Sequence, residues 1–399
     1  MGRRQTRRSV SAEQASILVL NVGSSTLKFA LFPVADSDDA LLRGVLEYSG
    51  PNGGRIRITD AQGRDDSRPS GVTRETAVSE LLEYLKANSV FASIQAVGHR
   101  LVHGGTRFRE PVRIDADVRT SLDEVVPLAP DHLPTELNAI DQLSGAAPSL
   151  PQVACFDTGF HSTLPTVARL FGLQRSLATS GVVRYGFHGL SYEYVARTLR
   201  LRGELPDRTV VAHLGNGASI TALLDGLSVD TSMGLTPTGG VLMGTRSGDL
   251  DPGVMLYLMR SHGFSPAALD DAVNHRGGLL GISESSSDVR RLLGVALADS
   301  KADEALGVFC YQVKKVIGSY AAALGGIDAL VFTGGIGEHS PEMRQRICDG
   351  LEFLGIEIDP ARNGDNAATI STSRGSVAVR IVKTDEEAMI ARHTRLLID

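Results

Sequence analysis

Two segments far apart in the chain repeat one pattern of apolar and polar positions. Residues 17–32 (ILVLNVGSSTLKFALF) form two apolar runs around a Gly-Ser-Ser turn, and residues 210–226 (VVAHLGNGASITALLDG) repeat that arrangement. Apolar runs separated by a glycine-rich turn predict two strands joined as a hairpin. A single hairpin of this kind carries no functional meaning. Its recurrence about half a chain later favours duplicated halves with a cleft between them.

The remaining chain alternates between helical and strand-like patterns. Apolar residues recur at helical spacing in 72–89, 190–201 and 303–326, and short apolar runs occupy 94–105, 152–161 and 328–335. This alternation predicts an α/β fold with mixed sheets. The chain has 399 residues, and domains average roughly 150 residues, so we expect two domains.

The glycine-rich turns are candidate phosphate sites. A third one, FTGGIGEHS at 332–340, also follows an apolar strand. Backbone N–H groups at such turns can point together at an anion, so three of them favour a phosphoryl-transfer enzyme. The first turn adds Asn21, Ser24, Thr26 and Lys28, groups that suit a metal-bound polyphosphate. A polar hairpin tip is the alternative for this turn alone, and the spacing is not that of a Walker A loop.

Composition and charge limit the partners. The formal net charge is −6, so the chain offers no general field for nucleic acid or an anionic membrane, and we expect neither partner. Cys155, Cys310 and Cys348 form no C-x-x-C pair and are expected to be buried thiols of a cytoplasmic protein. Residues 1–16 contain four arginines. We expect a disordered leader there, with a basic interaction or targeting arm as the alternative.

Several charged residues lie in loops or at strand ends. Arg100 ends a strand before a Gly-Gly turn, and Arg246 lies in a loop rich in glycine, threonine and proline. An arginine that clamps a transferring phosphoryl group contributes about 10³- to 10⁵-fold in rate, whereas a surface ion pair contributes at most about 1 kcal/mol. Asp157 at a strand end and His188 beside two glycines are further candidates, with a structural role as the alternative for each.

Acidic residues near the starts of two helices have two interpretations. Asp288 lies at a loop-to-helix boundary with Arg290 close by, and Glu386 and Glu387 open the last helix. Helix capping and the helix dipole account for acidic residues at such positions. One of the two glutamates is also a candidate magnesium ligand near the first turn.

Eight motifs occur in an order that resembles the acetate and propionate kinase family, in the actin, hexokinase and Hsp70 superfamily. They are NVGSSTLK, HRLVHGG, FDTGFH, RYGFHG, HLGNGAS, GTRSGDLDPG, FTGGIGEHS and TDEEAMIAR, and the similarity runs from about Ile17 to the end of the chain. The resemblance implies a two-lobed actin/hexokinase-like (ribonuclease H-like) fold with duplicated domains and a central nucleotide cleft. The expected lobes are 17–160 with the last helix at 386–399, and a nucleotide-binding lobe at 161–385.

The resemblance also implies roles for individual residues. The expected catalytic residues are Asp157, His188 and Arg246, and Asn21 and Glu386 are expected to hold Mg²⁺ or, as an alternative, Mn²⁺. Arg100 is expected to bind the substrate carboxylate, with Val102, His132, Phe187 and Pro237 also in the substrate site. ATP or ADP is expected to contact Lys28, His213, Leu214, Gly215, Asn216, Gly217, Asp288, Val289, Arg290, Gly335, Ile336, Gly337, Glu338 and His339. The family further implies a homodimer.

The implied reaction is reversible phosphorylation of acetate by ATP to acetyl phosphate, by direct in-line transfer. Acetate is ionised at pH 7 and needs no general base, so Asp157 has no obvious proton to remove. We therefore expect Asp157 to orient metal-bound water or the transition state. Arg100, Arg246, His188 and the metal then compensate the charge of an anion that approaches a polyanion.

Departures from the family pattern concern the acyl pocket more than the reaction. Asp131 and Leu133 flank His132 where the family generally has leucine and asparagine, Thr26 stands where serine is common, and His339 replaces a usual asparagine. A kinase for propionate or another short acyl chain is therefore the nearest alternative. An actin- or chaperone-like ATPase switch, or a phosphate-binding module without catalysis, are alternatives from other classes.

Overall fold

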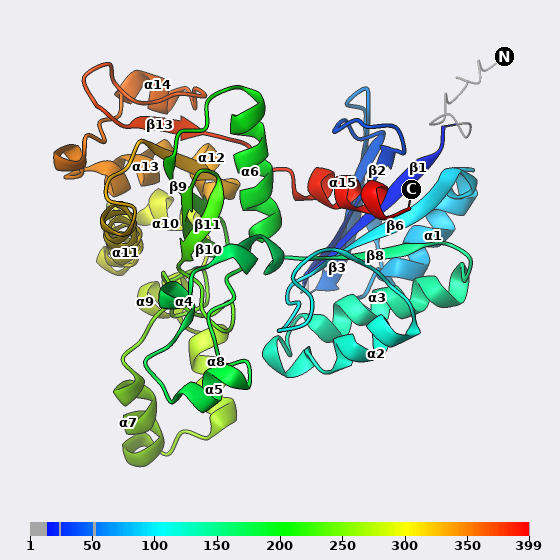
Figure 1. The fold of residues 1–399 in the computed structure, drawn as a ribbon, viewed down its shortest axis with the longest axis horizontal. Coiled ribbons are helices and arrows are strands. Elements are labelled where there is room, and N and C mark those ends of the chain that lie inside the picture. Colours follow the sequence, from blue (N-terminus) through cyan, green and yellow to red (C-terminus); the bar gives the residue numbers. More distant parts are fainter. Residues whose placement is uncertain (1–13, 24, 51–52, 399) are drawn as a thin grey trace. The chain divides into compact units, whose positions relative to one another are not determined.

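The computed structural model of the chain describes residues 14–23, 25–50 and 53–398 (Figure 1). Most of the basic leader at 1–16, together with Ser24, lies outside these residues. The chain divides into two compact units, of which unit 1 comprises Met1–Gly159 with Asp385–Asp399, and unit 2 comprises Phe160–Thr384. Each unit is described separately below.

Unit 1 is built on a sheet with the strand order β5-β4-β3-β2-β1-β6-β8-β7. The N-terminal strands form an antiparallel meander, and β1, β6 and β8 then run parallel to one another. The strands are β1 Ser16–Val22, β2 Thr26–Pro33, β3 Leu42–Gly50, β4 Gly53–Asp60, β5 Asp65–Ser70, β6 Ile94–Leu101, β7 Val112–Arg113 and β8 Gln152–Phe156.

Unit 2 is built on a second sheet with the order β11-β10-β9-β12-β13. Its strands are β9 Arg208–Leu214, β10 Ala218–Leu224, β11 Leu227–Thr231, β12 Ala329–Thr333 and β13 Ala378–Ile381. The hairpin strands pair antiparallel, and β9, β12 and β13 pair parallel.

The two sheets share one pairing scheme. In unit 1 the run β3-β2-β1-β6-β8 has two antiparallel and then two parallel pairings, and β11-β10-β9-β12-β13 repeats that sequence in unit 2. The two predicted hairpins are β1–β2 and β9–β10, which occupy equivalent places in this scheme. The predictions of a mixed α/β fold and of duplicated halves are therefore confirmed.

One face of the unit 1 sheet packs on helices α1 and α3. Leu18 and Leu20 of β1 join Leu81 of α1 and Leu143 of α3 in one buried core. At about 25 cal/mol per Å² of apolar surface, burial of one leucine side chain contributes roughly 1.5–3 kcal/mol to folding. The helices of this unit are α1 Ala77–Ala87, α2 Ala116–Asp123, α3 Leu133–Ala146 and α15 Glu386–Ile398, with short 3₁₀ turns at Phe91–Ser93 and Val126–Leu128.

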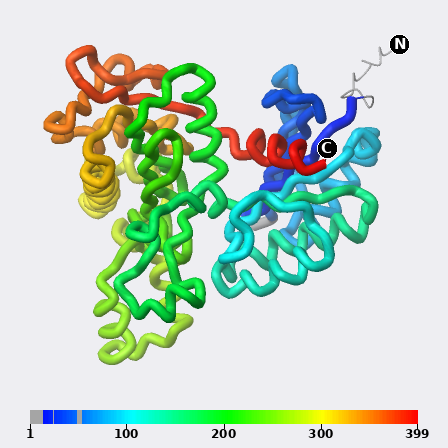
Figure 2. The backbone as a smooth tube through the Cα atoms, viewed as in Figure 1, coloured from blue at the N-terminus to red at the C-terminus, as the bar shows by residue number. Residues whose placement is uncertain are grey.

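The opposite face of this sheet is covered by α15, the last helix of the chain. It packs on β1, β6, β8 and β2, so the last helix lies beside the first strand (Figure 2). Gly98 of β6 permits this approach, because a Cβ there would stand 2.3 Å from Thr394 Oγ1 and 2.6 Å from Ile390 Cγ2. The sequence between residues 160 and 384 folds as the other unit before the chain returns to this sheet.

In unit 2, the long helix α11 runs against β9 and β10 (Figure 1). Its buried stripe includes Leu306, Phe309, Val313 and Ile317, at the spacing that predicts a buried helical face. The helices of this unit are α4 Thr166–Arg169, α5 Arg175–Thr179, α6 Gly189–Leu201, α7 Pro252–His262, α8 Pro266–Asn274, α9 Gly278–Ser283, α10 Val289–Val295, α11 Ser300–Ala323, α12 Gly334–His339, α13 Pro341–Cys348 and α14 Pro360–Gly364. Two 3₁₀ turns, Gly159–Thr163 and Glu352–Leu354, complete the elements.

The third glycine-rich segment follows a strand, as predicted, but it is the start of a helix and not an open turn. Helix α12 begins directly at Gly334 after β12. Gly334 has φ +76°, and a Cβ there would stand 2.8 Å from the Leu214 carbonyl oxygen. Glycine is therefore needed where the start of α12 packs against the end of β9.

Other expectations from the sequence concern the cysteines and membrane segments. Cys155, Cys310 and Cys348 are buried free thiols, as predicted. Within the ranges that the structure describes, no helix is long and apolar enough to cross a membrane.

Candidate functional site

Arg100 and Asp157 form a buried ion pair at the carboxyl ends of two parallel strands. Arg100 lies near the end of β6, and Asp157 directly follows β8. Arg100 Nε donates to Asp157 Oδ1 at 3.1 Å, and Nη2 donates to Oδ2 at 2.5 Å. The two side chains are 15% and 1% exposed. This fork geometry fixes both side chains at the edge where ligands bind in α/β sheets.

Glu136 is a third member of this group, and the sequence reasoning missed it. Its Oε2 accepts the backbone N–H of Val102 at 3.0 Å, and its Oε1 lies 3.8 Å from Arg100 Nη1. Desolvation raises the pKa of Glu136 to about 8, against the attraction of Arg100. The one signal in the sequence is a carboxylate on the apolar face of α3, beside Leu133 and Leu137.

Asn21 and Glu386 lie next to Arg100. Asn21 Nδ2 donates to Glu386 Oε2 at 3.5 Å, and Arg100 Nη1 donates to Asn21 Oδ1 at 3.5 Å. Desolvation raises the pKa of Glu386 to about 7, opposed by Arg100 and supported by Asp157. The negative charge of Glu386 is therefore only partly balanced by its neighbours, and a bound cation would stabilise it. The amide and carboxylate oxygens are hard ligands that suit Mg²⁺.

The number of protein ligands also fits magnesium. Across the described part of the chain, no group of three or more His, Cys, Asp or Glu side chains is placed to hold a metal. Mg²⁺ usually binds through one or two carboxylates, several waters and the substrate phosphates. Asn21 and Glu386 therefore fit a magnesium ion that arrives with a nucleotide, and they do not fit a permanent all-protein metal site.

Arg100 interacts with several carboxylates of this region. Desolvation acts to lower the pKa of Arg100, but the attractions of Asp157, Glu386 and Glu136 outweigh it and raise that pKa. Arg100 is thus permanently charged, and it faces three carboxylates. Protonation of one of these carboxylates, or a cation bound to it, would leave more of the Arg100 charge for a further carboxylate ligand.

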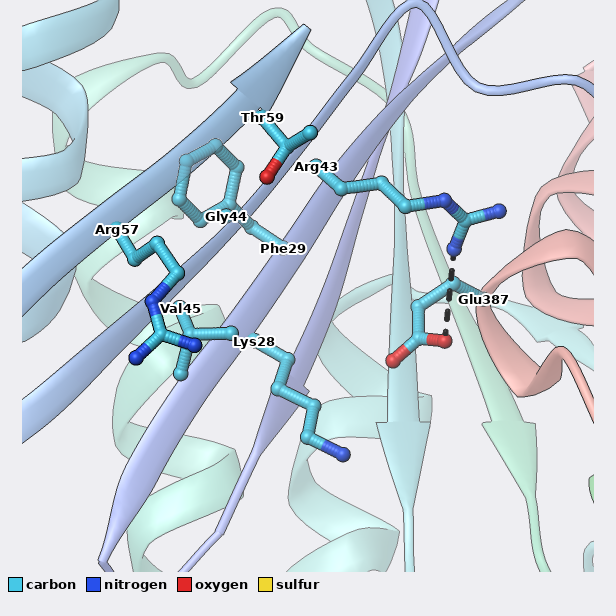
Figure 3. Close-up of a pocket in the computed structure, with 8 residues that line it drawn as sticks. All are labelled: Lys28, Phe29, Arg43, Gly44, Val45, Arg57, Thr59 and Glu387. Carbon is cyan, nitrogen blue, oxygen red and sulfur yellow. Dashed lines mark ion pairs between the residues drawn. The ribbon is translucent and has the colours of Figure 1, made fainter. Parts of the chain in front are cut away.

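Lys28 lines a small cavity of about 190 Å³ on the sheet of unit 1, beside the first turn of α15 (Figure 3). Arg43 and Arg57 line it as well, and Arg43 Nη1 lies 3.9 Å from Glu387 Oε2. Arg43 also donates to both carboxylate oxygens of Asp385. Arg43 therefore holds the residues on both sides of Glu386, which aligns the start of α15.

In unit 2, two of the predicted nucleotide segments lie side by side. The end of β9 and the turn after it carry His213 to Gly217, and α12 with Gly335 to His339 follows β12. Because β9 and β12 are parallel neighbours, with Thr333 paired to His213, their carboxyl ends meet at one edge. The start of α12 packs on Leu214. Backbone N–H groups from a turn and a helix start are thereby brought together.

His188 and Arg246 meet over this glycine turn. A Cβ on Gly217 would stand 3.2 Å from His188 Nε2 and 3.6 Å from Arg246 Nη1. Arg246 Nη1 donates to the carbonyl oxygen of Pro237 at 3.2 Å, so the predicted residue Pro237 lies in the same place. His188 has φ +58° just before α6, and its ring stacks on His213 at 4.3 Å. A non-glycine residue in this conformation is uncommon and often functional.

Further predicted residues have internal partners. Glu338 Oε1 accepts the N–H groups of Gly334 at 2.9 Å and Thr384 at 3.2 Å. The Phe187 carbonyl oxygen lies 3.0 Å from His161 Nε2, a second residue that the sequence reasoning missed. Asp288 caps α10 by accepting the N–H of Arg290 at 2.8 Å, as capping predicted. The segment of Asp288, Val289 and Arg290 lies on a separate element from the glycine turns.

The predicted residues therefore form two groups. Unit 1 carries Asn21, Lys28, Arg100, Val102, Asp157 and Glu386, with His132 at the residue before α3. Unit 2 carries Phe187, His188, Pro237, Arg246 and the nucleotide segments. In unit 1, Arg100 and Asp157 lie at the carboxyl ends of parallel strands, and in unit 2 the glycine turn after β9 and the start of α12 do.

Comparisons with known proteins identify the family of this chain. The model of the acetokinase family matches residues 16–392. An acetate kinase of Rhodopseudomonas palustris is 43% identical over 96% of this chain and 98% of its own length, and one of Methylocella silvestris is 42% identical with the same coverage.

Solved structures give the same result. A propionate kinase from Francisella tularensis has a TM-score of 0.90 at 36% identity and covers 96% of this chain and 100% of its own. An acetate kinase from Porphyromonas gingivalis has a TM-score of 0.85 at 38% identity with the same coverage. Because a family model and relatives above 30% identity match nearly the whole chain, the chain belongs to the acetokinase family.

Proposed function

We propose that this protein transfers the γ-phosphoryl group of ATP reversibly to acetate, giving acetyl phosphate and ADP. An acetate oxygen forms a bond to the γ-phosphorus, the bond from that phosphorus to the β,γ-bridging oxygen breaks, and ADP leaves with the electron pair. No proton needs to move, because acetate is ionised at neutral pH. The observation that carries the proposal is the meeting of His188 and Arg246 over the Gly217 turn, in a chain of the acetokinase family.

Each charged residue has a role that follows from the charge problem of this reaction. His188 and Arg246 stabilise the charge of the transferring phosphoryl group, and Lys28 contacts the phosphates. Arg100 binds the acetate carboxylate, with Val102, His132, Phe187 and Pro237 around it. The segments at 213–217, 288–290 and 335–339 bind the nucleotide.

Asp157 orients Arg100, because it accepts two charge-assisted hydrogen bonds from Arg100. Asn21 and Glu386 hold Mg²⁺, which neutralises phosphate charge when it is bound, and Mn²⁺ substitutes for it. The raised pKa of Glu386 supports this assignment, because a divalent cation would favour the ionised carboxylate.

A propionate kinase is the second candidate. The propionate kinase structure has a higher TM-score to this chain than the acetate kinase structure, 0.90 against 0.85. The residues around His132 also depart from the expected pattern, with exposed Asp131 and fully buried Leu133. One methylene in an apolar pocket changes specificity by about 10- to 200-fold, so a small difference in this pocket would decide the preferred substrate.

We also propose that the protein acts as a cytoplasmic homodimer. None of the side chains of α7 is buried, although the helix includes Val254, Leu256, Tyr257 and Met259. Leu256 is 48% exposed and Tyr257 is 58% exposed. An apolar helix of this kind favours contact with a second copy.

The test is a hydroxamate-trapping assay with Mg²⁺ and ATP on acetate, propionate and butyrate, with ADP release without an acyl substrate as control. The fastest formation of acetyl hydroxamate supports the proposal, and a preference for propionate supports the second candidate. ADP release without any hydroxamate would contradict both and favour an ATPase switch.

Two variants test the assigned roles. Arg246→Ala is expected to fold and to lose about 10³-fold or more in kcat, because the guanidinium acts mainly in the transition state. Arg100→Ala is expected to raise the KM for acetate more than the KM for ATP. An unchanged acetate KM would refute carboxylate binding by Arg100.

A further inference from the structure

A chain of hydrogen bonds in unit 2 leads from a buried phenol to the ring of His188. Tyr192 Oη lies 2.5 Å from Ser219 Oγ, and Ser219 Oγ lies 2.8 Å from His188 Nδ1. Tyr192 comes from α6, one turn after His188, and Ser219 comes from β10. Both Tyr192 and Ser219 are 0% exposed, so water does not compete for these hydrogen bonds.

The direction of the protons along this chain follows from the chemistry of the three groups. Burial raises the pKa of Tyr192 well above its ordinary value, so the phenol keeps its proton and is a donor. Ser219 has one proton and two lone pairs. If its oxygen accepts from Tyr192, its own proton is available for His188 Nδ1. A neutral imidazole that accepts at Nδ1 carries its proton on Nε2.

The other ring nitrogen of His188 faces the glycine turn. Nε2 lies 3.2 Å from the point where a Cβ of Gly217 would stand, and Arg246 Nη1 lies 3.6 Å from the same point. A second full positive charge beside this arginine is unfavourable, which favours a neutral ring. The ring cannot turn freely, because it stacks on His213 with an interplanar angle of 20°.

We propose that Tyr192 and Ser219 are positioning residues that hold His188 as the neutral tautomer with its proton on Nε2, a hydrogen-bond donor toward the phosphoryl group. The identity of the acceptor rests on the proposed function. The tautomer itself is a property of the free protein. His188 then acts as a fixed donor that needs no protonation, and Arg246 supplies the full charge.

The tautomer is measured by NMR of protein with ¹⁵N-labelled histidine, at neutral pH and without substrate. The signals of His188 are assigned by their loss in His188→Gln. The expected pattern is a proton on Nε2 and a bare Nδ1. A neutral ring with its proton on Nδ1, or a doubly protonated ring, would overturn the proposal.

Variants of the chain separate positioning from general stability. Ser219→Ala removes the donor to Nδ1 and is expected to give a mixture of tautomers and about a 10- to 100-fold loss of kcat, with the KM values for acetate and ATP changed less than about threefold. Ser219→Thr keeps a hydroxyl and is expected to restore the Nε2 tautomer. Tyr192→Phe is expected to have a smaller effect in the same direction.

The matched control is Tyr185→Phe, which removes a buried phenol that donates to the Gly181 carbonyl oxygen at 3.0 Å instead. Its His188 spectrum should match that of the wild type. An unchanged tautomer in Ser219→Ala would refute the proposal. If the protein does not phosphorylate a carboxylate but His188 has the expected tautomer, the proposed function fails and the positioning role stands.

Discussion

At the scale of single residues, two buried histidines make the stability of the fold depend on pH. His99 Nε2 lies 2.7 Å from Gln152 Oε1 in unit 1, and His161 lies between Ser228 and the Phe187 carbonyl oxygen in unit 2. Desolvation lowers the pKa of each to about 4, against the hydrogen bonds to Gln152 and Phe187. Unfolded histidine has a pKa near 6.5. Each of these side chains therefore favours folding less as the pH falls from about 6.5 to 4.

Glu136 and Glu386 change the stability with pH in the opposite direction from the two histidines. Their pKa values in the folded chain, about 8 and about 7, lie above the ordinary value of 4.5. The folded state binds these protons more tightly, so their contribution to stability is fully present below about pH 4.5 and is lost as the pH rises toward 8 and 7. Both glutamates lie in unit 1 and oppose the effect of His99 there. The effect of a buried histidine on stability at low pH is therefore easier to measure in unit 2, through His161.

His161→Gln tests this response. The amide keeps a donor for the Phe187 carbonyl oxygen but cannot be protonated in this range. The loss of unfolding free energy between pH 7 and pH 5 is expected to shrink by about 2 kcal/mol relative to the wild type, since the unfolded histidine is protonated at pH 5 and the folded one is not. Urea denaturation at the two pH values measures it. His262→Gln, at an exposed position, is the control, and an equal pH response in wild type and His161→Gln would contradict the prediction.

At the scale of elements, helix α15 carries the candidate metal ligand Glu386, and contacts at its first turn hold it against the rest of unit 1. Asp385 accepts the N–H of Ala388 at 3.0 Å and thereby caps the helix, and it also pairs with Arg43. Arg43 comes from β3 and points toward Glu387 in the first turn of α15 (Figure 3). A strand in the N-terminal part of the chain thereby aligns the residues on both sides of Glu386.

Arg43→Gln tests this alignment. It is expected to weaken binding of Mn²⁺–ADP by about 10- to 100-fold, because outer residues that orient metal ligands typically have effects of that size. Titration calorimetry measures the affinity without turnover. Arg57→Gln is the control, because Arg57 lines the same cavity but its ion pair is with Glu47, at 3.9 Å. Equal affinities of Arg43→Gln and wild type would exclude this role of Arg43.

Gly98→Ala tests how closely α15 must approach the sheet. The added methyl would meet Thr394 and Ile390, and overpacking of this kind typically costs about 1–3 kcal/mol. The urea midpoint should fall accordingly. Gly145→Ala, in α3 with open space around the new methyl, should leave stability unchanged or raise it by up to about 1 kcal/mol. A Gly98→Ala midpoint equal to that of Gly145→Ala would show that α15 is not packed as described.

The sequence predicts elements well where local pattern decides them. The helix α1 and the strand β12 lie within the predicted segments, and the hairpin of β1 and β2 and the helices α6 and α11 overlap theirs with ends shifted by one to three residues, since their apolar spacing is regular. The strands β3 to β5 and the start of α12 at Gly334 were not predicted, because edge-strand pairing and the close packing on Leu214 depend on distant segments. Among site residues, Arg100 and His188 stand in conspicuous glycine-rich surroundings. Glu136 and Ser219 act only through contacts made after folding, which no local pattern contains.

At the scale of the whole molecule, the exposed apolar helix α7 predicts association. Tyr257→Lys is expected to shift the protein toward monomers, because it places a charge within the proposed contact between copies. Light scattering after size exclusion measures the mass over a dilution series. Leu201→Lys, at a position 70% exposed at the end of α6, should leave the mass unchanged. A dimer of undiminished affinity in Tyr257→Lys would place the interface elsewhere.

The return of the chain to unit 1 through α15 also bears on how the protein is made. A ribosome releases β1, β6 and β8 early, but the helix that covers one face of these strands is synthesised only after all of unit 2. That apolar face, with Ile17 and Val19, then stays open while all of unit 2 emerges. Unit 2 is one continuous stretch and can complete its fold first. Nascent chains that stall before residue 385 should therefore be substrates for chaperones that bind exposed apolar strands, and the completed chain should not.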